Sequence, residues 1–200
     1  MQKDERQVQL LARYREGRVP WDDVLPPPEV VAVAARLSAG WVLDLGCGYG
    51  RAAIYLARLG WRAVGVDFVH LAVAEARHRA LAAGVGRQTL FVQGRVTELG
   101  FLNGRFDFIL DVGCLHNLTE PETAQYSQHV TRLLKKGGTY QLFAHLRDEK
   151  KPSLEEQRWI AEQTILTQFQ PHLTLVKAEK GWTQVENNPP WQSAWFWFQK

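Results

Sequence analysis

The 200-residue sequence contains few cysteines, no long apolar run and no long run of charges of one sign. Its two cysteines, Cys47 and Cys114, are too few for a disulfide framework and lack the spacing of a zinc site, so no metal is expected. A membrane-spanning helix needs about 18 consecutive apolar residues, which are absent here. The charged start of the chain differs from a signal peptide, and these features together predict a cytoplasmic protein without a membrane partner.

The balance of charges is also unremarkable, because 24 basic residues are nearly matched by 21 acidic ones. A net charge of +3 without a basic stripe argues against nucleic acid as a partner. The sequence is 46% hydrophobic, which is enough for one well-buried domain with small additions.

The first 40 residues are organised differently from the rest. Apolar positions repeat with helical spacing in residues 3–16, prolines mark a loop near Trp21, and Pro28 suits the start of a second helix that runs to about Leu37. We expect residues 1–40 to form N-terminal helices and a lid packed on a main domain of residues 41–200, with one structural domain overall.

From Trp41 onward, strand-like and helix-like segments alternate, which predicts a doubly wound α/β fold. The expected strands are 41–45, 62–66, 88–93, 106–111 and 138–144, and the expected helices are 51–59, 69–83, 120–134 and 155–168. Two further strand-like segments, 172–178 and 193–198, follow without a helix between them and can pair as an antiparallel hairpin. The prediction is a mostly parallel, seven-stranded sheet with helices on both faces and an antiparallel C-terminal strand.

A glycine-rich turn after the first of these strands carries the clearest functional signal. Asp44 ends the strand, alternate glycines follow at Gly46, Gly48 and Gly50, and a helix-like segment comes next. Glycines in such a turn let backbone amides approach a nucleotide-like ligand. A second acid, Asp67, ends the next strand, about where a βαβ unit places the carboxylate that binds a ribose.

These residues resemble the class I S-adenosylmethionine-dependent methyltransferases. The segment Asp44-Leu45-Gly46-Cys47-Gly48-Tyr49-Gly50 is similar to that family's cofactor loop, and Asp67-Phe68 is similar to its ribose-binding acid followed by a residue that packs on adenine. The segment Leu133-Leu134-Lys135-Lys136-Gly137-Gly138 resembles the family's turn before the fifth strand, with Lys136 in place of proline.

The resemblance implies S-adenosyl-L-methionine as the cofactor. It implies that the glycine loop, including Cys47, faces the methionine part, that Asp44 faces its amino end, and that Asp67 accepts the ribose hydroxyls. The family usually has an acid after the third strand that contacts the adenine, but this chain has Arg95 there. Backbone groups of Arg95 and Val96, or the side chain of Glu98, are therefore the expected adenine contacts, and Asp111 is a further candidate that either frames the cofactor or ends its strand.

Two other motifs point to competing functions. The dinucleotide fingerprint needs a glycine in the sixth place, where this chain has Arg51, so the spacing disfavours NAD. The tetrapeptide Asn188-Pro189-Pro190-Trp191 matches the motif of amino methyltransferases, but it follows the wrong strand, and a proline-rich turn is the simpler interpretation.

The segment after the fourth strand bears on the methyl acceptor. Asp111-Val112-Gly113-Cys114-Leu115-His116 resembles the pattern of small-molecule methyltransferases, particularly those that methylate thiols and chalcogens. His116 is the candidate catalytic residue, either as a general base or as a group that orients the acceptor. The candidate walls of a substrate pocket are Trp21, Cys114, Trp182 and Trp191, of which the three tryptophans lie in loop-like surroundings.

The sequence leaves two classes of function open. In the first, the protein is an enzyme that methylates a small thiol, hydroxyl, amine or chalcogen acceptor. In the second, it keeps the methyltransferase fold but only binds the cofactor or a partner.

Overall fold

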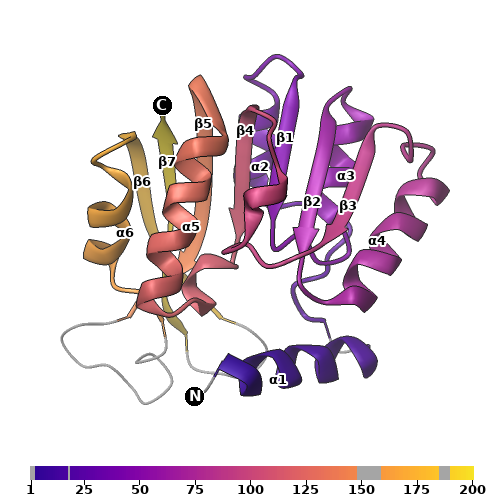
Figure 1. Cartoon of the computed structure of the whole chain (residues 1–200), viewed down its shortest axis with the longest axis horizontal. Coiled ribbons are helices and arrows are strands. Elements are labelled where there is room, and N and C mark those ends of the chain that lie inside the picture. Colours follow the sequence, from indigo (N-terminus) through magenta and orange to yellow (C-terminus); the bar gives the residue numbers. More distant parts are fainter. Residues whose placement is uncertain (1–2, 18, 148–158, 185–189) are drawn as a thin grey trace. The chain divides into compact units, whose positions relative to one another are not determined.

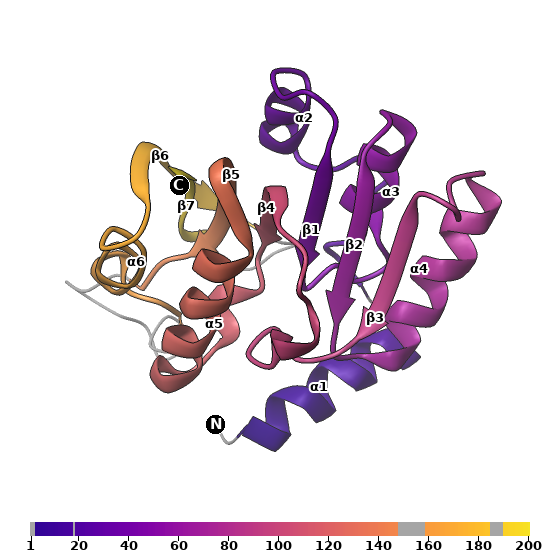
Figure 2. The ribbon, with the colours of Figure 1, turned by 45° about the horizontal axis from the view of Figure 1, so that its top comes forward.

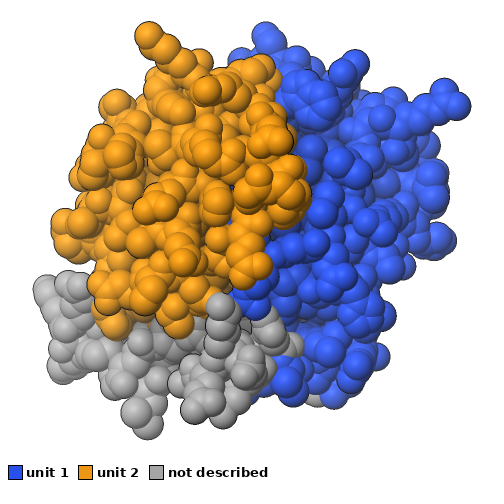
Figure 3. Space-filling view, viewed as in Figure 1, with its two compact units in different colours: residues 1–96 blue, residues 97–200 orange. Residues whose placement is uncertain are grey.

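The computed structural model describes residues 3–17, 19–147, 159–184 and 190–200, and it divides into two compact units, residues 1–96 and 97–200 (Figure 3). The predicted division at residue 40 therefore differs from the division between residues 96 and 97, and it stays a prediction. Among the described residues, no helix is long and apolar enough to cross a membrane.

The first unit is a parallel three-stranded sheet with helices (Figure 1). Its elements are α1 (Lys3–Arg15), α2 (Pro28–Ala34), β1 (Trp41–Leu45), α3 (Arg51–Arg58), β2 (Arg62–Asp67), α4 (His70–Ala82) and β3 (Thr89–Gln93). The strand order is β3-β2-β1, and Asp44 lies opposite Gly65 in the register of β1 and β2. The strand-end acids Asp44 and Asp67 therefore come from the carboxyl ends of neighbouring strands.

Burial explains why these segments adopt this arrangement. After its exposed first residue, each of β1 and β2 is buried throughout, as expected for parallel strands covered by helices. Helix α3 buries five of its eight residues and contacts all three strands, while α4 contacts β2 and lies alongside β3 (Figure 2). The strands can therefore hold the loops at their carboxyl ends in fixed positions.

The second unit contains four strands in the order β4-β5-β7-β6. Its elements are η1 (Leu99–Phe101), β4 (Phe106–Val112), η2 (Leu115–Asn117), α5 (Glu120–Leu133), β5 (Leu134–His145), α6 (Glu162–Phe169), β6 (Thr174–Thr183) and β7 (Trp191–Gln199). Strands β4 and β5 are parallel, whereas β7 pairs antiparallel with both β5 and β6. The predicted seven strands with an antiparallel closing pair are confirmed.

Aromatic side chains form the core between the helices and strands of the second unit. Tyr140 of β5 packs against Phe169 of α6 and Phe198 of β7, with ring centroids 5.0 and 5.9 Å apart. Tyr126 of α5 reaches the same cluster, 6.4 Å from Phe169. All four rings are fully buried, so this face of β4–β7 is covered by α5 and α6.

Two predictions about the C-terminal region need correction. The helix expected at 155–168 is α6, which begins at Glu162 and ends at Phe169, and residues 155–158 lie outside the described part of the chain. Trp182 and Trp191 were expected in loops, but they lie in β6 and β7, because the hairpin strands are longer than their apolar alternation suggested. Of the tetrapeptide at 188–191, Asn188 and Pro189 lie outside the described residues.

Helix α5 begins with a capping box that fixes the end of the preceding η2 loop. The Glu122 carboxylate accepts hydrogen bonds from the backbone N–H and the hydroxyl of Thr119, at 3.0 and 2.8 Å. Such a cap satisfies donors that have no partner within the helix.

Replacing Thr119 by Ala is expected to lower the free energy of unfolding by about 1 kcal/mol, because the cap is lost. Urea denaturation followed by circular dichroism measures this change. Thr167→Ala makes the same chemical change at an exposed position within α6 and should be neutral or slightly stabilising. Equal effects of the two substitutions would contradict a capping role for Thr119.

Candidate functional site

The glycine turn at 46–50 is held against the end of β2 by backbone and side-chain hydrogen bonds. The amides of Gly46 and Cys47 both donate to the carbonyl of Val66, at 2.8 and 3.1 Å. The amide of Gly48 donates to Oδ2 of Asp67 at 2.9 Å. The turn predicted from sequence and the predicted ribose acid are therefore in direct contact.

Asp67 is buried, and its other oxygen, Oδ1, accepts the amide of Val69 at 2.9 Å. Burial raises the pKa of Asp67, and the backbone donors of Val69, Gly48 and Phe68 partly oppose that effect. The two carboxylate oxygens together have four lone pairs, so the group keeps capacity for a further donor beside these three backbone amides. A ligand hydroxyl fits this acceptor.

Asp44 occupies the corresponding position at the end of β1. Its side chain is 4% exposed, and Oδ2 accepts the amide of Ala53 in the first turn of α3 at 3.2 Å. Cys47 is also buried, with Sγ directed at the carbonyl of Gly48 at 3.7 Å. Asp44 therefore ties β1 to α3 and places a negative group beside the start of the glycine turn.

Tyr14 of α1 covers the glycine turn, which the sequence did not indicate. Gly48 has a φ of +54°, and a Cβ there would lie 3.1 Å from the Tyr14 hydroxyl oxygen. The Tyr14 ring packs edge-on against Tyr49 at 5.2 Å, and its hydroxyl accepts the indole N–H of Trp21 at 3.3 Å. Burial, and then the nearby Asp67, raise the pKa of Tyr14, so it stays a neutral hydroxyl.

Arg79 of α4 connects the N-terminal segment to the same turn. Its guanidinium donates to both oxygens of Asp22, at 3.0 and 2.9 Å, and to Glu75 at 2.8 Å. It also lies 4.4 Å from the centroid of the Tyr49 ring. Trp21, a predicted substrate-pocket residue, is 38% exposed. Because its indole N–H donates to Tyr14, it is part of the same cover over the turn.

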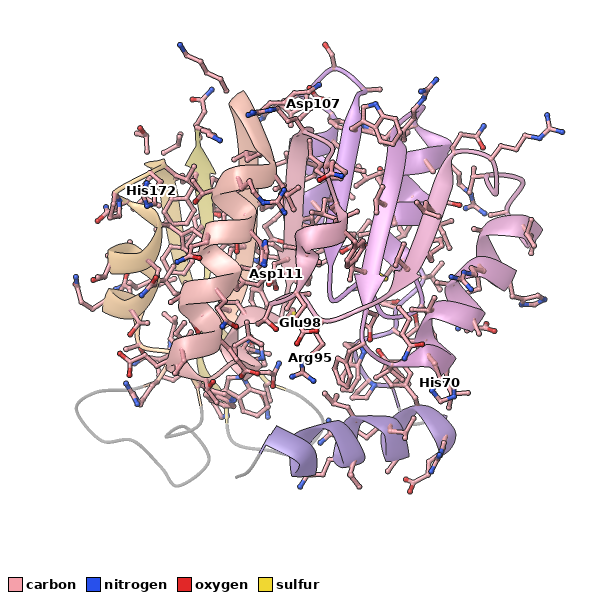
Figure 4. All side chains as sticks on the ribbon, viewed as in Figure 1. His70, Arg95, Glu98, Asp107, Asp111 and His172 are labelled. Atoms are coloured by element: carbon pink, nitrogen blue, oxygen red, sulfur yellow. The ribbon has the colours of Figure 1, made fainter. Side chains whose placement is uncertain are left out.

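The predicted adenine-binding residues follow the carboxyl ends of β2 and β3. Phe68 is partly buried against the cluster of Tyr14, Val69 and Ala72. Arg95 and Val96 follow β3, where Figure 4 marks Arg95, and Val96 is buried. The adenine contacts of these residues stay predictions.

In the second unit, Asp111 anchors the loop that carries His116. Asp111 lies at the carboxyl end of β4 (Figure 4) and is fully buried. Oδ1 accepts the amide of Cys114 at 2.7 Å, whereas Oδ2 accepts the amide of Leu115 at 3.0 Å and the hydroxyl of Tyr126 at 2.7 Å. These bonds give Asp111 a positioning role, and its contact with a cofactor stays a prediction.

His116 packs closely on the backbone of this loop. Gly113 has a φ of +90°, and a Cβ there would lie 3.3 Å from Cε1 of His116. The ring is 6% exposed, stacks on His145 with centroids 4.3 Å apart, and its Nδ1 accepts the backbone N–H of His145 at 3.1 Å. Asp111, Gly113 and His116, which belong to the segment that resembles small-molecule methyltransferases, therefore each have a structural role.

The predicted tryptophan walls do not share one face of the hairpin. Thr183 pairs with Trp191 and Trp182 pairs with Gln192, and adjacent strand residues point to opposite faces. Trp191 therefore lies on the face of His145, with ring centroids 5.3 Å apart. Trp182 is 67% exposed on the other face, so the two cannot line one pocket.

Sequence reasoning missed Tyr14, Arg79, His145 and Trp159 as neighbours of the candidate sites. His145 could have been identified from the sequence, because it directly follows a predicted strand. Asp44 and Asp67 were identified from the same kind of position at the end of a strand. The others depend on contacts between residues far apart in the chain, such as Asp22 and Arg79, which are separated by 57 positions. Among the described residues, no cluster of His, Cys, Asp or Glu is suited to a metal ion.

Comparison with known proteins agrees with this geometry. Residues 42–138 match the family model described as a methyltransferase domain. The chain is 32% identical, over 125 residues, to the 2-heptyl-1-hydroxyquinolin-4(1H)-one methyltransferase of Mycobacteroides abscessus, a match that covers 62% of this chain and 55% of that protein. The chain spans about half the length of the curated relatives it matches.

Solved structures show the same fold over nearly the whole chain. The 1,6-didemethyltoxoflavin-N1-methyltransferase of Burkholderia thailandensis, solved with 1,6-didemethyltoxoflavin and S-adenosylhomocysteine, is 25% identical with a TM-score of 0.75, and the match covers 96% of this chain and 86% of that one. TehB from Haemophilus influenzae is 16% identical with a TM-score of 0.77, and the match covers 95% and 67%. The similarity to TehB, at this low identity, shows only that the fold is shared.

Gly48→Ala is expected to lower the free energy of unfolding by about 1–2 kcal/mol, because its φ lies in the left-handed region and its Cβ would crowd Tyr14. Thermal and urea denaturation measure the loss. Gly100→Ala is the matched control, since a Cβ there meets no atom within 4 Å and its φ is ordinary. A loss at Gly100 as large as that at Gly48 would refute this explanation.

The buried Asp111 predicts a particular dependence of stability on pH. Burial raises its pKa from 3.8 to about 7, although Tyr126 and the loop amides oppose the rise. The folded state thus binds the proton more tightly than the unfolded state, so this stabilisation is present at low pH and is lost as the pH rises from about 4 to about 7.

We therefore compare the free energy of unfolding of the wild type with that of Asp111→Asn. The difference, wild type minus variant, should fall between pH 4 and 7 and then level off. The fall should amount to about 1.4 kcal/mol for every pH unit that separates the folded pKa from the unfolded one. Urea denaturation at a series of pH values measures this difference. Tyr126→Phe removes a hydrogen-bond donor that favours the charged carboxylate, so the pKa of Asp111 should rise further. The difference should then level off at a higher pH than in the protein with Tyr126. A difference that is constant or rises with pH would be inconsistent with the buried acid.

Proposed function

We propose that this chain, whose residues 42–138 belong to the class I S-adenosylmethionine-dependent methyltransferases, transfers a methyl group from S-adenosylmethionine to a small-molecule acceptor. The observation that carries the proposal is the hydrogen bond between the Gly48 amide and Asp67, which joins the glycine turn to the strand-end acid. A turn without that acid would be compatible with many other ligands.

The residues present fit the cofactor. The positive φ angles of Gly46, Gly48 and Gly50 let the turn curve closely around a ligand, and the Asp67 carboxylate can accept a ribose hydroxyl. Asp44 supplies negative charge for an amino group. In this proposal, Phe68, Arg95 and Val96 contact the adenine.

When bound, S-adenosylmethionine supplies a methyl group on a sulfonium, whose carbon–sulfur bond breaks as the acceptor's lone pair bonds to the carbon, with the electron pair remaining on sulfur. The protein then has to bind, orient the acceptor and exclude water. Tyr14, Trp21 and Tyr49 form an apolar cover over the turn, which suits the exclusion of water.

A small-molecule acceptor is supported by the relatives, since one is named for a hydroxyquinolone and another was solved with 1,6-didemethyltoxoflavin. The acceptor atom, whether in a thiol, hydroxyl, amine or chalcogen, belongs to the proposal. In the second unit, the loop of Cys114 and His116 is the proposed acceptor side, because Asp111 holds it rigidly and His116 is its polar group.

Isothermal titration calorimetry with S-adenosylmethionine tests the cofactor assignment. We expect binding to the wild-type protein, and Asp67→Ala should weaken it about 10- to 100-fold, because hydrogen bonds to a charged group are lost. Glu179→Ala, which removes an exposed carboxylate from β6, should bind as the wild type does.

A folded wild-type protein that does not bind S-adenosylmethionine would refute the proposal. Product formation across a panel of thiols, ring hydroxyls and amines then distinguishes an enzyme from a binding protein. Binding without any methylated product would favour the catalytically inactive alternative.

A further inference from the structure

The hydroxyl group of Tyr14 is a buried donor whose hydrogen has no acceptor among the described residues. The hydrogen bond that its oxygen makes within that part of the chain is the one it accepts from the indole N–H of Trp21, at 3.3 Å. Tyr14 is 8% exposed, and burial keeps its pKa far above the usual value, so the hydroxyl retains its hydrogen. A buried donor without an acceptor is costly, so such a group points to a ligand or water that supplies one.

Two contacts fix the position of this hydroxyl. The ring of Tyr14 packs edge-on against Tyr49 at 5.2 Å, and a Cβ on Gly48 would lie 3.1 Å from the hydroxyl oxygen. The oxygen therefore lies against the glycine turn. Because the indole N–H of Trp21 occupies one of its lone pairs, the O–H bond turns away from the indole.

Asp67 is a buried acceptor that contacts the same glycine. Its Oδ2 accepts the amide of Gly48 at 2.9 Å, and the carboxylate keeps capacity for a further donor. Asp67 is close enough to Tyr14 for its charge to raise the pKa of that hydroxyl, yet no direct hydrogen bond joins these two described side chains. A group that both accepts and donates can join them, and a hydroxyl has both capacities.

We propose that Tyr14 is a binding residue for the methyl donor, because its hydroxyl donates to one ribose hydroxyl of the donor and that ribose hydroxyl donates to Asp67. This inference rests on the proposed methyltransferase function and adds a residue of the N-terminal segment to its donor site. A deoxy sugar lacks the oxygen that Tyr14 needs, and a phosphorylated sugar lacks the hydrogen that Asp67 needs. The pair therefore selects a ribose with this hydroxyl free.

An ion pair with α4 keeps the Tyr14 hydroxyl in place. Asp22 directly follows Trp21 and accepts hydrogen bonds from Arg79 at 3.0 and 2.9 Å. Arg79 also donates to Glu75 at 2.8 Å, but both of these residues belong to α4, so that bond does not reach the N-terminal segment. Asp22 and Arg79 are therefore positioning residues, which act on the ligand through Trp21 and Tyr14.

Calorimetric titration with S-adenosylhomocysteine and its 2′-deoxy and 3′-deoxy analogues tests the proposal without turnover. The wild type should bind S-adenosylhomocysteine. It should bind the analogue that lacks the bridging hydroxyl about 10- to 100-fold more weakly, because a hydrogen bond to the charged Asp67 is lost together with the one from Tyr14.

Tyr14→Phe keeps the ring and removes the hydroxyl. We expect it to bind S-adenosylhomocysteine about three- to tenfold more weakly than the wild type does. It should bind the analogue without the bridging hydroxyl as the wild type does, because the oxygen that accepts from Tyr14 is already missing. Tyr55→Phe makes the same change in α3 and is the matched control, which should bind all three compounds as the wild type does.

A second pair of variants tests the positioning role of Asp22. Asp22→Asn should weaken binding of S-adenosylhomocysteine about two- to fivefold, because the ion pair with Arg79 is lost. In a protein that already carries Tyr14→Phe, the same change should have no further effect, since it acts through Tyr14. Glu75→Gln removes the other carboxylate partner of Arg79 and should bind as the wild type does. Equal losses in the proteins with and without Tyr14 would overturn this positioning role.

The inference fails if Tyr14→Phe binds S-adenosylhomocysteine as the wild type does, or if the wild type binds both deoxy analogues as tightly as S-adenosylhomocysteine. It also fails if Tyr14→Phe loses the same factor for all three compounds, because the hydroxyl would then act on water or on the fold. In each of these cases the wild type still binds the cofactor product, so the proposed function stands. A folded wild type that binds neither S-adenosylmethionine nor S-adenosylhomocysteine would instead refute the proposed function, and the inference with it.

Discussion

Buried carboxylates at the ends of strands hold the functional loops of this protein, and the rest of both candidate sites depends on them. Asp44 accepts an amide of α3, Asp67 accepts the amides of Gly48 and Val69, and Asp111 accepts those of Cys114 and Leu115. A buried carboxylate needs hydrogen-bond donors, and the loop amides need acceptors, so the two kinds of group satisfy each other. The same groups that end the strands therefore fix the shape of the loops.

Within this scheme the two units have separate tasks in the proposed reaction. Residues of the first unit supply the acids, the glycine turn and the aromatic cover for the methyl donor. In that proposal, the second unit supplies the loop of Cys114 and His116, which Asp111 holds, for the acceptor. The two sites differ in composition, because strand-end carboxylates dominate the first site, whereas the second also contains the stacked rings of His116 and His145.

Much of the fold could be predicted from the sequence, because its signals are local. The alternation of strands and helices, the glycine turn and the strand-end acids follow from neighbouring residues, and the seven strands with their antiparallel pair are as expected. Strand pairing is not local, so the register that puts Trp182 and Trp191 on opposite faces could not be predicted. The tautomer of His116 likewise depends on an amide 29 positions away.

The contact of Tyr14 with Gly48 bears on how the molecule can be divided into fragments. The family match begins at residue 42, which suggests that a fragment starting near Trp41 would retain the whole glycine turn. Such a fragment would lack Tyr14 and Trp21, together with Asp22, the partner of Arg79. The turn would keep its sequence but lose the side chains that cover it, so the smallest piece that keeps both the turn and its cover has to begin before Tyr14.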